Sequence, residues 1–122
     1  MRSVLLVGGG KVGRTIARFL ARTGDYDVTV ADADARAFRN FSACDGCRTS
    51  VVDATDKDAL CEAATGKDVV VSALSYAYNV RVATAALEAG ASYFDLTEDV
   101  ATTRAVRLLA DRAAPGQVFV PQ

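Results

Sequence analysis

A short apolar run that leads directly into spaced glycines constrains this chain more than any other feature. Residues 3–7 read Ser-Val-Leu-Leu-Val, and Gly-Gly-Gly-Lys-Val-Gly follows at once. Gly8, Gly10 and Gly13 fit the pattern G-x-G-x-x-G, which forms a phosphate-binding turn when a strand precedes it and a helix follows it. We therefore predict a strand that passes through a glycine turn into a helix, with a pyrophosphate bound against the backbone of that turn.

The residues after the glycines supply the helix that this pattern requires. Residues 11–23 place apolar side chains at helical spacing along one face. These side chains are Val12, Ile16, Ala17 and Leu20. In such a turn Gly8 permits the tight bend, Gly10 lets a pyrophosphate approach the main chain, and Gly13 lets the helix pack close to the strand. The helix N-terminus adds unpaired N–H groups and a positive dipole end, and both attract phosphate.

An acidic residue stands where a dinucleotide site needs one. Residues 26–31 alternate as a second strand, and Asp32 lies at its end. In this fold that position hydrogen-bonds the adenosine ribose hydroxyls, and its charge repels the 2′-phosphate of NADP. Ala33 follows, where an arginine would favour NADP, although Arg36 is close enough in sequence to reach a phosphate. We therefore predict a preference for NAD over NADP.

The rest of the chain alternates expected strands with expected helices. Further strands are predicted at 48–52, 68–72, 92–96 and 117–120, and further helices at 34–41, 55–64, 79–89 and 97–113. Thr55 and Thr97 are expected to cap two of these helices. Strands joined by helices form right-handed crossovers and a parallel sheet. The prediction is an α/β, Rossmann-like doubly wound sheet of six parallel strands in the order 3-2-1-4-5-6, with helices on both faces.

This topology predicts where a ligand lies. The crevice of a doubly wound sheet opens beyond the carboxyl ends of the first and fourth strands. Four segments that are distant in sequence should therefore meet there, namely 8–13, Asp32, 53–55 and 72–75.

Composition excludes several classes of function. The 122 residues suffice for one domain with a core, and a net charge of −1 gives no general attraction to nucleic acid or a membrane surface. No apolar run approaches the roughly 18 residues that span a bilayer, and no signal peptide is recognisable, so we expect a cytoplasmic protein. The chain has no histidine, which excludes Ser-His-Asp and Cys-His catalytic arrangements within it.

Three cysteines give no clear metal or redox site. Cys44 and Cys47 have C-x-x-C spacing, and Cys61 stands alone. A zinc site would need a second pair or histidines, which the chain lacks. We interpret the C-x-x-C segment as a turn that carries two ordinary thiols, and we predict no metal site.

Several later segments resemble one enzyme family. They are Val-Val-Ser-Ala-Leu at 70–74, Asn79 with Ala-Thr-Ala-Ala-Leu-Glu-Ala-Gly at 83–90, Tyr-Phe-Asp-Leu-Thr-Glu at 93–98 and Val-Phe-Val-Pro-Gln at 118–122. Together they resemble the N-terminal NAD(P)-binding domain of the saccharopine dehydrogenase family, and the segment at 93–98 is the most discriminating. The resemblance covers nearly the whole chain but only about the first third of a typical family enzyme.

The resemblance implies roles for individual residues. The cofactor-binding residues that it implies are Gly8, Gly9, Gly10, Lys11, Val12, Gly13, Asp32, Asp53, Ala54, Ala73, Leu74 and Ser75. The glycine turn with the Lys11 and Val12 N–H groups would hold the phosphates, and 53–54 would border the adenine. Residues 73–75 would pass the pyrophosphate and nicotinamide ribose. Thr97 and Glu98 would lie near the nicotinamide end, although helix capping also accounts for Thr97.

The resemblance also implies a reaction. Family members use NAD(P) to form or oxidise a secondary amine that joins an amino acid to a carbonyl partner. Residues 1–122 would then be a single cofactor-binding domain, an N-terminal fragment that binds nucleotide without turnover. A C-terminal domain would hold the small amino-acid-derived substrate, and the chain could form a homodimer. No catalytic residue is assigned from the sequence.

A second hypothesis comes from a different class of protein. Regulatory nucleotide-binding domains of potassium channels and transporters have this size, and Asp-Ala-Thr-Asp at 53–56 suits them. Such a domain binds NAD(H) or another nucleotide to shift a conformational equilibrium and performs no chemistry. The segment at 93–98 is not typical of that class, so the oxidoreductase domain is the favoured interpretation.

Overall fold

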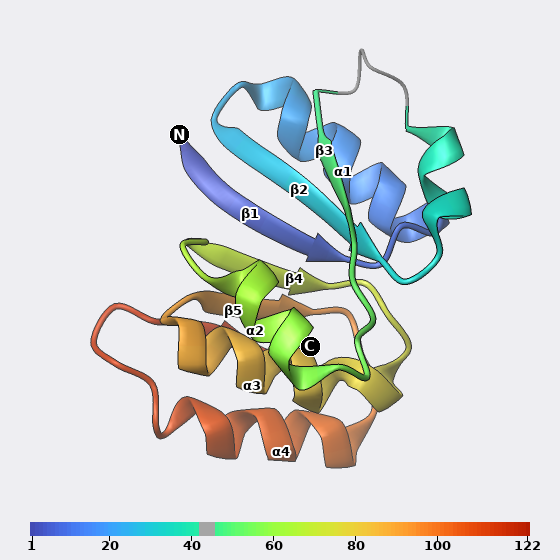
Figure 1. Cartoon of the computed structure of the whole chain (residues 1–122). Coiled ribbons are helices and arrows are strands. Elements are labelled where there is room, and N and C mark those ends of the chain that lie inside the picture. Colours follow the sequence, from blue (N-terminus) through green and yellow to red (C-terminus); the bar gives the residue numbers. More distant parts are fainter. Residues whose placement is uncertain (42–45) are drawn as a thin grey trace.

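A six-stranded parallel sheet organises the molecule (Figure 1). The computed structural model describes residues 1–41 and 46–122. Its strands are β1 (Arg2–Val7), β2 (Tyr26–Asp32), β3 (Arg48–Val51), β4 (Val69–Ser72), β5 (Ser92–Asp95) and β6 (Phe119–Val120). They lie in the order β3-β2-β1-β4-β5-β6, and every pairing between neighbours is parallel. The predicted Rossmann-like fold and strand order are confirmed.

Helices connect the strands where the periodicity placed them. The α-helices are α1 (Lys11–Thr23), α2 (Lys57–Ala64), α3 (Asn79–Ala89) and α4 (Val100–Ala110), and the 3-10 helices are η1 (Ala35–Asn40) and η3 (Tyr76–Tyr78). The helix predicted at 34–41 is therefore a 3-10 helix. The last helix ends three residues earlier than predicted, because its final turns tighten to i→i+3 hydrogen bonds ahead of Pro115, which disfavours helix at the residue before it.

The predicted N-caps at Thr55 and Thr97 are wrong by one and two residues. Asp56 caps α2, where its Oδ1 accepts from the Ala59 N–H at 3.1 Å. Asp99 caps α4, where its Oδ2 accepts from the N–H of the third helical residue at 2.9 Å. Each threonine is instead held in a turn by an aspartate two residues before it, so the helix begins later.

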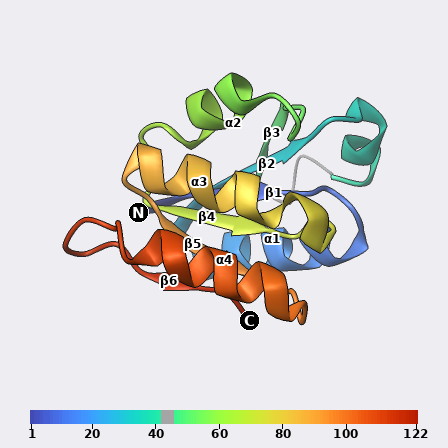
Figure 2. The same cartoon turned by 90° about the horizontal axis from the view of Figure 1, so that it is seen from below.

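Helices cover the two faces of the sheet unequally. Figure 2 shows α2, α3 and α4 side by side on one face, with α1 behind the sheet. The first face holds the larger core, which includes the fully buried ring of Tyr93. On the other face α1 packs over β1 and β2. The ladders align Val71, Phe94 and Val120 across β4, β5 and β6 on this side, and Phe94 and Val120 are 37% and 42% exposed. We call these three residues the open sheet face.

The cysteine segment, membrane-spanning helices and metal sites were also considered in the sequence. Cys44 lies outside the described residues, so the interpretation of the C-x-x-C segment stays a prediction. Cys47 is partly buried, with its thiol 3.7 Å from the Ala17 carbonyl oxygen. Among residues 1–41 and 46–122, no helix is long and apolar enough to cross a bilayer, and no group of three metal-ligating side chains comes together.

Candidate dinucleotide-binding site

The glycine turn joins β1 to α1 through two close backbone contacts. Gly8 has a φ of +113°, and its N–H donates to the Ala31 carbonyl oxygen at 2.8 Å. A Cβ at Gly8 would lie 2.9 Å from the Ala73 carbonyl oxygen, and a Cβ at Gly13 would collide with the Gly8 carbonyl oxygen. Both glycines are therefore needed to bring helix, turn and sheet together, whatever binds there.

Gly10 differs from its neighbours because the fold does not require it. Its φ of −74° suits any residue, and a Cβ there would have no atom within 4 Å. Gly10 is the N-cap of α1, no side chain caps this end, and the first turn holds no acidic residue. The first N–H groups of the helix lack intrahelical acceptors and point into the crevice end of the sheet. An anion such as a pyrophosphate fits this arrangement.

The Asp32 carboxylate is fixed beside the turn. Its Oδ2 accepts from the Gly9 N–H and its Oδ1 from the Asp34 N–H, both at 2.8 Å. Each carboxylate oxygen keeps further acceptor capacity. The two N–H groups thus orient a negatively charged acceptor toward the crevice, where it could bind ribose hydroxyls.

A turn after β3 forms the next wall. Asp53 Oδ1 accepts from the Thr55 N–H at 2.9 Å and from its hydroxyl at 2.7 Å, and these bonds hold the pKa of Asp53 below its usual value. A cavity of about 180 Å³ lies between this turn, Asp32 and the loop after β4. Its lining includes Ala54, Leu74 and Tyr78. The predicted adenine-side residues therefore lie together at the carboxyl edge.

The loop after β4 separates this cavity from a second one. The Ala73 N–H donates to the Val7 carbonyl oxygen at 2.8 Å, which closes the loop against β1. Beyond it, a cavity of about 310 Å³ is lined by Val12, Ala73, Leu74, Tyr76, Leu96 and Thr97. This is the side on which the nicotinamide half was predicted. Ser75 is exposed and lines neither cavity, and Glu98 is also exposed.

Comparison with known proteins identifies the relatives of this site. The family described as "Saccharopine dehydrogenase NADP binding domain" matches residues 4–120. The chain belongs to this family. Its cofactor is accordingly a nicotinamide dinucleotide, and the match does not favour the regulatory-domain hypothesis.

Two solved structures resemble this saccharopine dehydrogenase-type domain. Apo saccharopine dehydrogenase (L-Glu forming) from Saccharomyces cerevisiae matches with a TM-score of 0.83 and 25% sequence identity, over 98% of this chain and 26% of that chain. A Rossmann-fold NAD(P)-binding family protein from Shigella flexneri has a TM-score of 0.73 and 17% identity, over 99% and 66% of the two chains. The second match shows the fold alone. The chain thus spans about a quarter of the yeast protein.

The family segment at 93–98 has a structural role that the sequence did not reveal. The Tyr93 hydroxyl donates to Asp95 Oδ2 at 2.7 Å, and burial with this bond raises the pKa of Tyr93 far above its usual value. Asp95 is 4% exposed, and its Oδ1 accepts from the N–H groups of Thr97 and Gln122, each at 3.1 Å. Asp95 thereby positions Thr97 in the wall of the 310 Å³ cavity. Residues two apart in a strand share a face, so the strand predicted at 92–96 could have predicted the contact between Tyr93 and Asp95.

Proposed function

We propose that this chain is the cofactor-binding part of an NAD(P)-dependent oxidoreductase that acts on a secondary amine or imine of an amino-acid conjugate. One observation supports it above all: the uncapped N-terminus of α1 and the Asp32 carboxylate meet at Gly9, whose N–H donates to Asp32 at 2.8 Å. A single dinucleotide could then place its pyrophosphate at the helix N-terminus and its adenosine ribose at Asp32. A bound nicotinamide dinucleotide supplies the means to move a hydride. The residues named here bind and orient it.

We propose NAD as the preferred cofactor. Asp32 presents a fixed negative charge where NADP carries its 2′-phosphate, and Ala33 offers no compensating cation. The nearby Arg36 is paired with Asp34, with Nη2 2.9 Å from Oδ2. This ion pair is exposed and thus weak, so Arg36 could be recruited by a phosphate, and the family description itself names NADP. Calorimetric titration with both cofactors tests the preference, and tighter binding of NADP would overturn it.

We also propose that polypeptide beyond residues 1–122 completes the enzyme. Parallel sheets are normally covered on both faces, yet Phe94 and Val120 of the open sheet face are exposed. Leu96, which is 48% exposed, lines the 310 Å³ cavity, so polypeptide packed over β5 would also border the nicotinamide side. Substrate and cofactor must be held in contact for reaction, and we infer that further polypeptide would supply the wall beside Leu96.

Two measurements test the function. Residues 1–122 should bind NAD and should not oxidise saccharopine or related secondary amines, whereas the complete gene product that contains them should turn over one of these substrates. Absence of cofactor binding would refute the proposed site, and turnover by residues 1–122 would refute the need for further polypeptide. Sedimentation of wild type and Phe94→Lys completes the test, because a dimer that depends on Phe94 would assign the open sheet face to self-association.

A further inference from the structure

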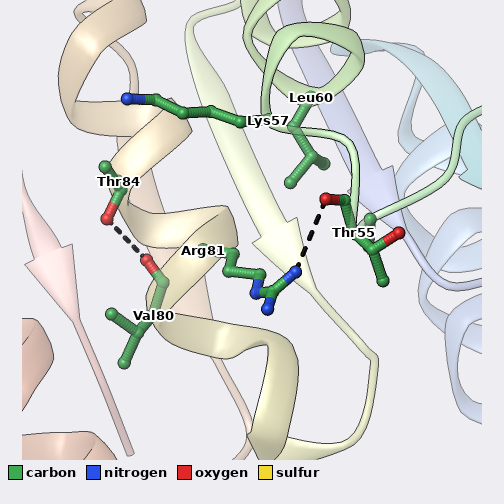
Figure 3. Close-up of a pocket in the computed structure, with 7 residues that line it drawn as sticks. Thr55, Lys57, Leu60, Val80, Arg81 and Thr84 are labelled. Carbon is green, nitrogen blue, oxygen red and sulfur yellow. Dashed lines mark hydrogen bonds between the residues drawn. The ribbon is translucent and has the colours of Figure 1, made fainter.

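A cavity that adjoins the predicted site lies between α2 and α3 (Figure 3). Its volume is about 280 Å³. Ala54, Leu60 and Val80 give it apolar walls, and the Arg81 side chain extends across it from α3 toward Thr55. Ala54 and Thr55 also line the 180 Å³ cavity beside Asp32, so the two cavities are neighbours that share a wall.

We place the adenine ring from the wall that the two cavities share. The cavity beside Asp32 has about 180 Å³, and Ala54 and Thr55 line both it and the α2–α3 cavity. With the diphosphate at α1 and the ribose at Asp32, the base lies at the far end, toward the turn at 53–55. The α2–α3 cavity continues in that direction, and its apolar lining suits a purine ring.

Arg81 is placed to cover a ring in this position. Its Nη1 lies 3.5 Å from the Thr55 carbonyl oxygen, which is a long contact, and its charge also attracts the nearby Asp53 carboxylate. Arg81 is exposed, so its guanidinium can shift at little cost. A guanidinium is flat and cationic, and it stacks on aromatic rings, including nucleic-acid bases.

We propose that Arg81 binds the cofactor by stacking on its adenine ring, with Ala54 and Leu60 forming the opposite wall. The proposal rests on the proposed function, because it places one end of the same dinucleotide. Sequence analysis assigned no role to Arg81 or Leu60, since the cavity forms between two helices that are far apart in sequence.

Titration of NAD into Arg81→Ala, Arg81→Lys and a matched control tests the proposal. Arg107→Ala is the control, because Arg107 is an exposed arginine on α4, away from both cavities. Loss of a cation–π contact should weaken NAD binding by about fivefold in Arg81→Ala, and Arg107→Ala should bind like wild type. Arg81→Lys should recover only part of the affinity, since an ammonium keeps the cation–π attraction but lacks the plane that stacks on the ring.

Nuclear magnetic resonance of the wild type distinguishes stacking on the cofactor from a role of Arg81 in protein stability alone. Stacking on adenine should shift the Arg81 side-chain Nε–H resonance through the ring current when NAD is added, and the Arg107 resonance should stay in place. The Arg81→Lys spectrum assigns the peak. Wild-type affinity in Arg81→Ala, full rescue by lysine, or an unmoved Arg81 resonance would each overturn the stacking role while the proposed function stands. Failure of wild type to bind NAD would overturn both.

Discussion

Substitution of Gly10 by alanine should separate the folding role of the glycine turn from its binding role. The new Cβ would have no atom within 4 Å, and the φ of −74° is allowed for alanine. Loss of glycine at an N-cap costs about 0.5–1 kcal/mol, and the reduced entropy of the unfolded chain returns about 0.4–1 kcal/mol. The free energy of unfolding should therefore change by less than about 0.5 kcal/mol, a Tm shift of roughly 2 °C.

Cofactor binding should respond very differently to the same substitution. The methyl group would occupy the space through which a pyrophosphate approaches the first N–H groups of α1. Loss of one charge-assisted hydrogen bond costs about 1.5–3 kcal/mol, which corresponds to roughly 10- to 150-fold weaker binding. Calorimetry with NAD measures the affinity, and thermal unfolding without ligand measures the stability.

Gly13→Ala is the matched control for this experiment. Its Cβ would collide with the Gly8 carbonyl oxygen, so it should destabilise the apo protein by about 1–3 kcal/mol or more through overpacking. The two variants should therefore differ: Gly10→Ala should keep its stability and lose NAD binding, whereas Gly13→Ala should lose stability. If Gly10→Ala binds NAD as tightly as wild type, the pyrophosphate does not lie at this turn and the reasoning fails.

Three further substitutions or conditions test other parts of the structure. Asp32→Asn removes the charge that opposes a 2′-phosphate, so the ratio of NADP to NAD affinity should rise by about tenfold in paired titrations, and an unchanged ratio would contradict the assigned role. Tyr93→Phe deprives the buried Asp95 of one donor and should lower the free energy of unfolding in urea by about 1–3 kcal/mol, which an unaltered midpoint would disprove. Bonds from the Thr102 hydroxyl and N–H lower the pKa of Asp99 from its usual 3.8, so the unfolded state binds more protons in acid. Stability should therefore fall as pH drops below about 4, and Asp99→Asn, which retains a capping oxygen, should show a shallower acid-side slope in pH-dependent denaturation.

Local patterns predicted the first helix to the residue and the strands on either side of it to within one residue. The bounds of α1 match the predicted 11–23, because the glycine turn fixes its start and Gly24, with a φ of +76°, fixes its end. The caps of α2 and α4 were displaced because two good capping residues compete in each loop. Thr55 and Asp56 are adjacent, and the turn closed by the Asp53 carboxylate decides which one begins the helix.

The residues of the candidate site also divide into those that local sequence patterns predicted and those that only tertiary packing brings together. Of the segments predicted to meet, Val12, Asp32, residues 53–55 and residues 73–74 line the two cavities. Ser75, at the end of the predicted segment 72–75, lines neither cavity, and the ligand roles stay predictions. Tyr78 and Arg81 escaped sequence reasoning, because their cavities arise where loops and helices from different crossovers converge. No spacing within one segment encodes such a contact.

Because helices cover the sheet unequally, the two ends of the crevice have different surroundings. On the proposed adenine side, α2 and α3 border an open cavity with the nearly inaccessible Leu60 in its wall. On the proposed nicotinamide side, the cavity wall includes Leu96, which is 48% exposed. A dinucleotide bound along this crevice would have its adenosine half held by this domain and its reactive half facing the uncovered surface. If the proposed function holds, these residues would supply most of the contacts to the adenosine half, and polypeptide packed on the uncovered side would surround the reacting atoms.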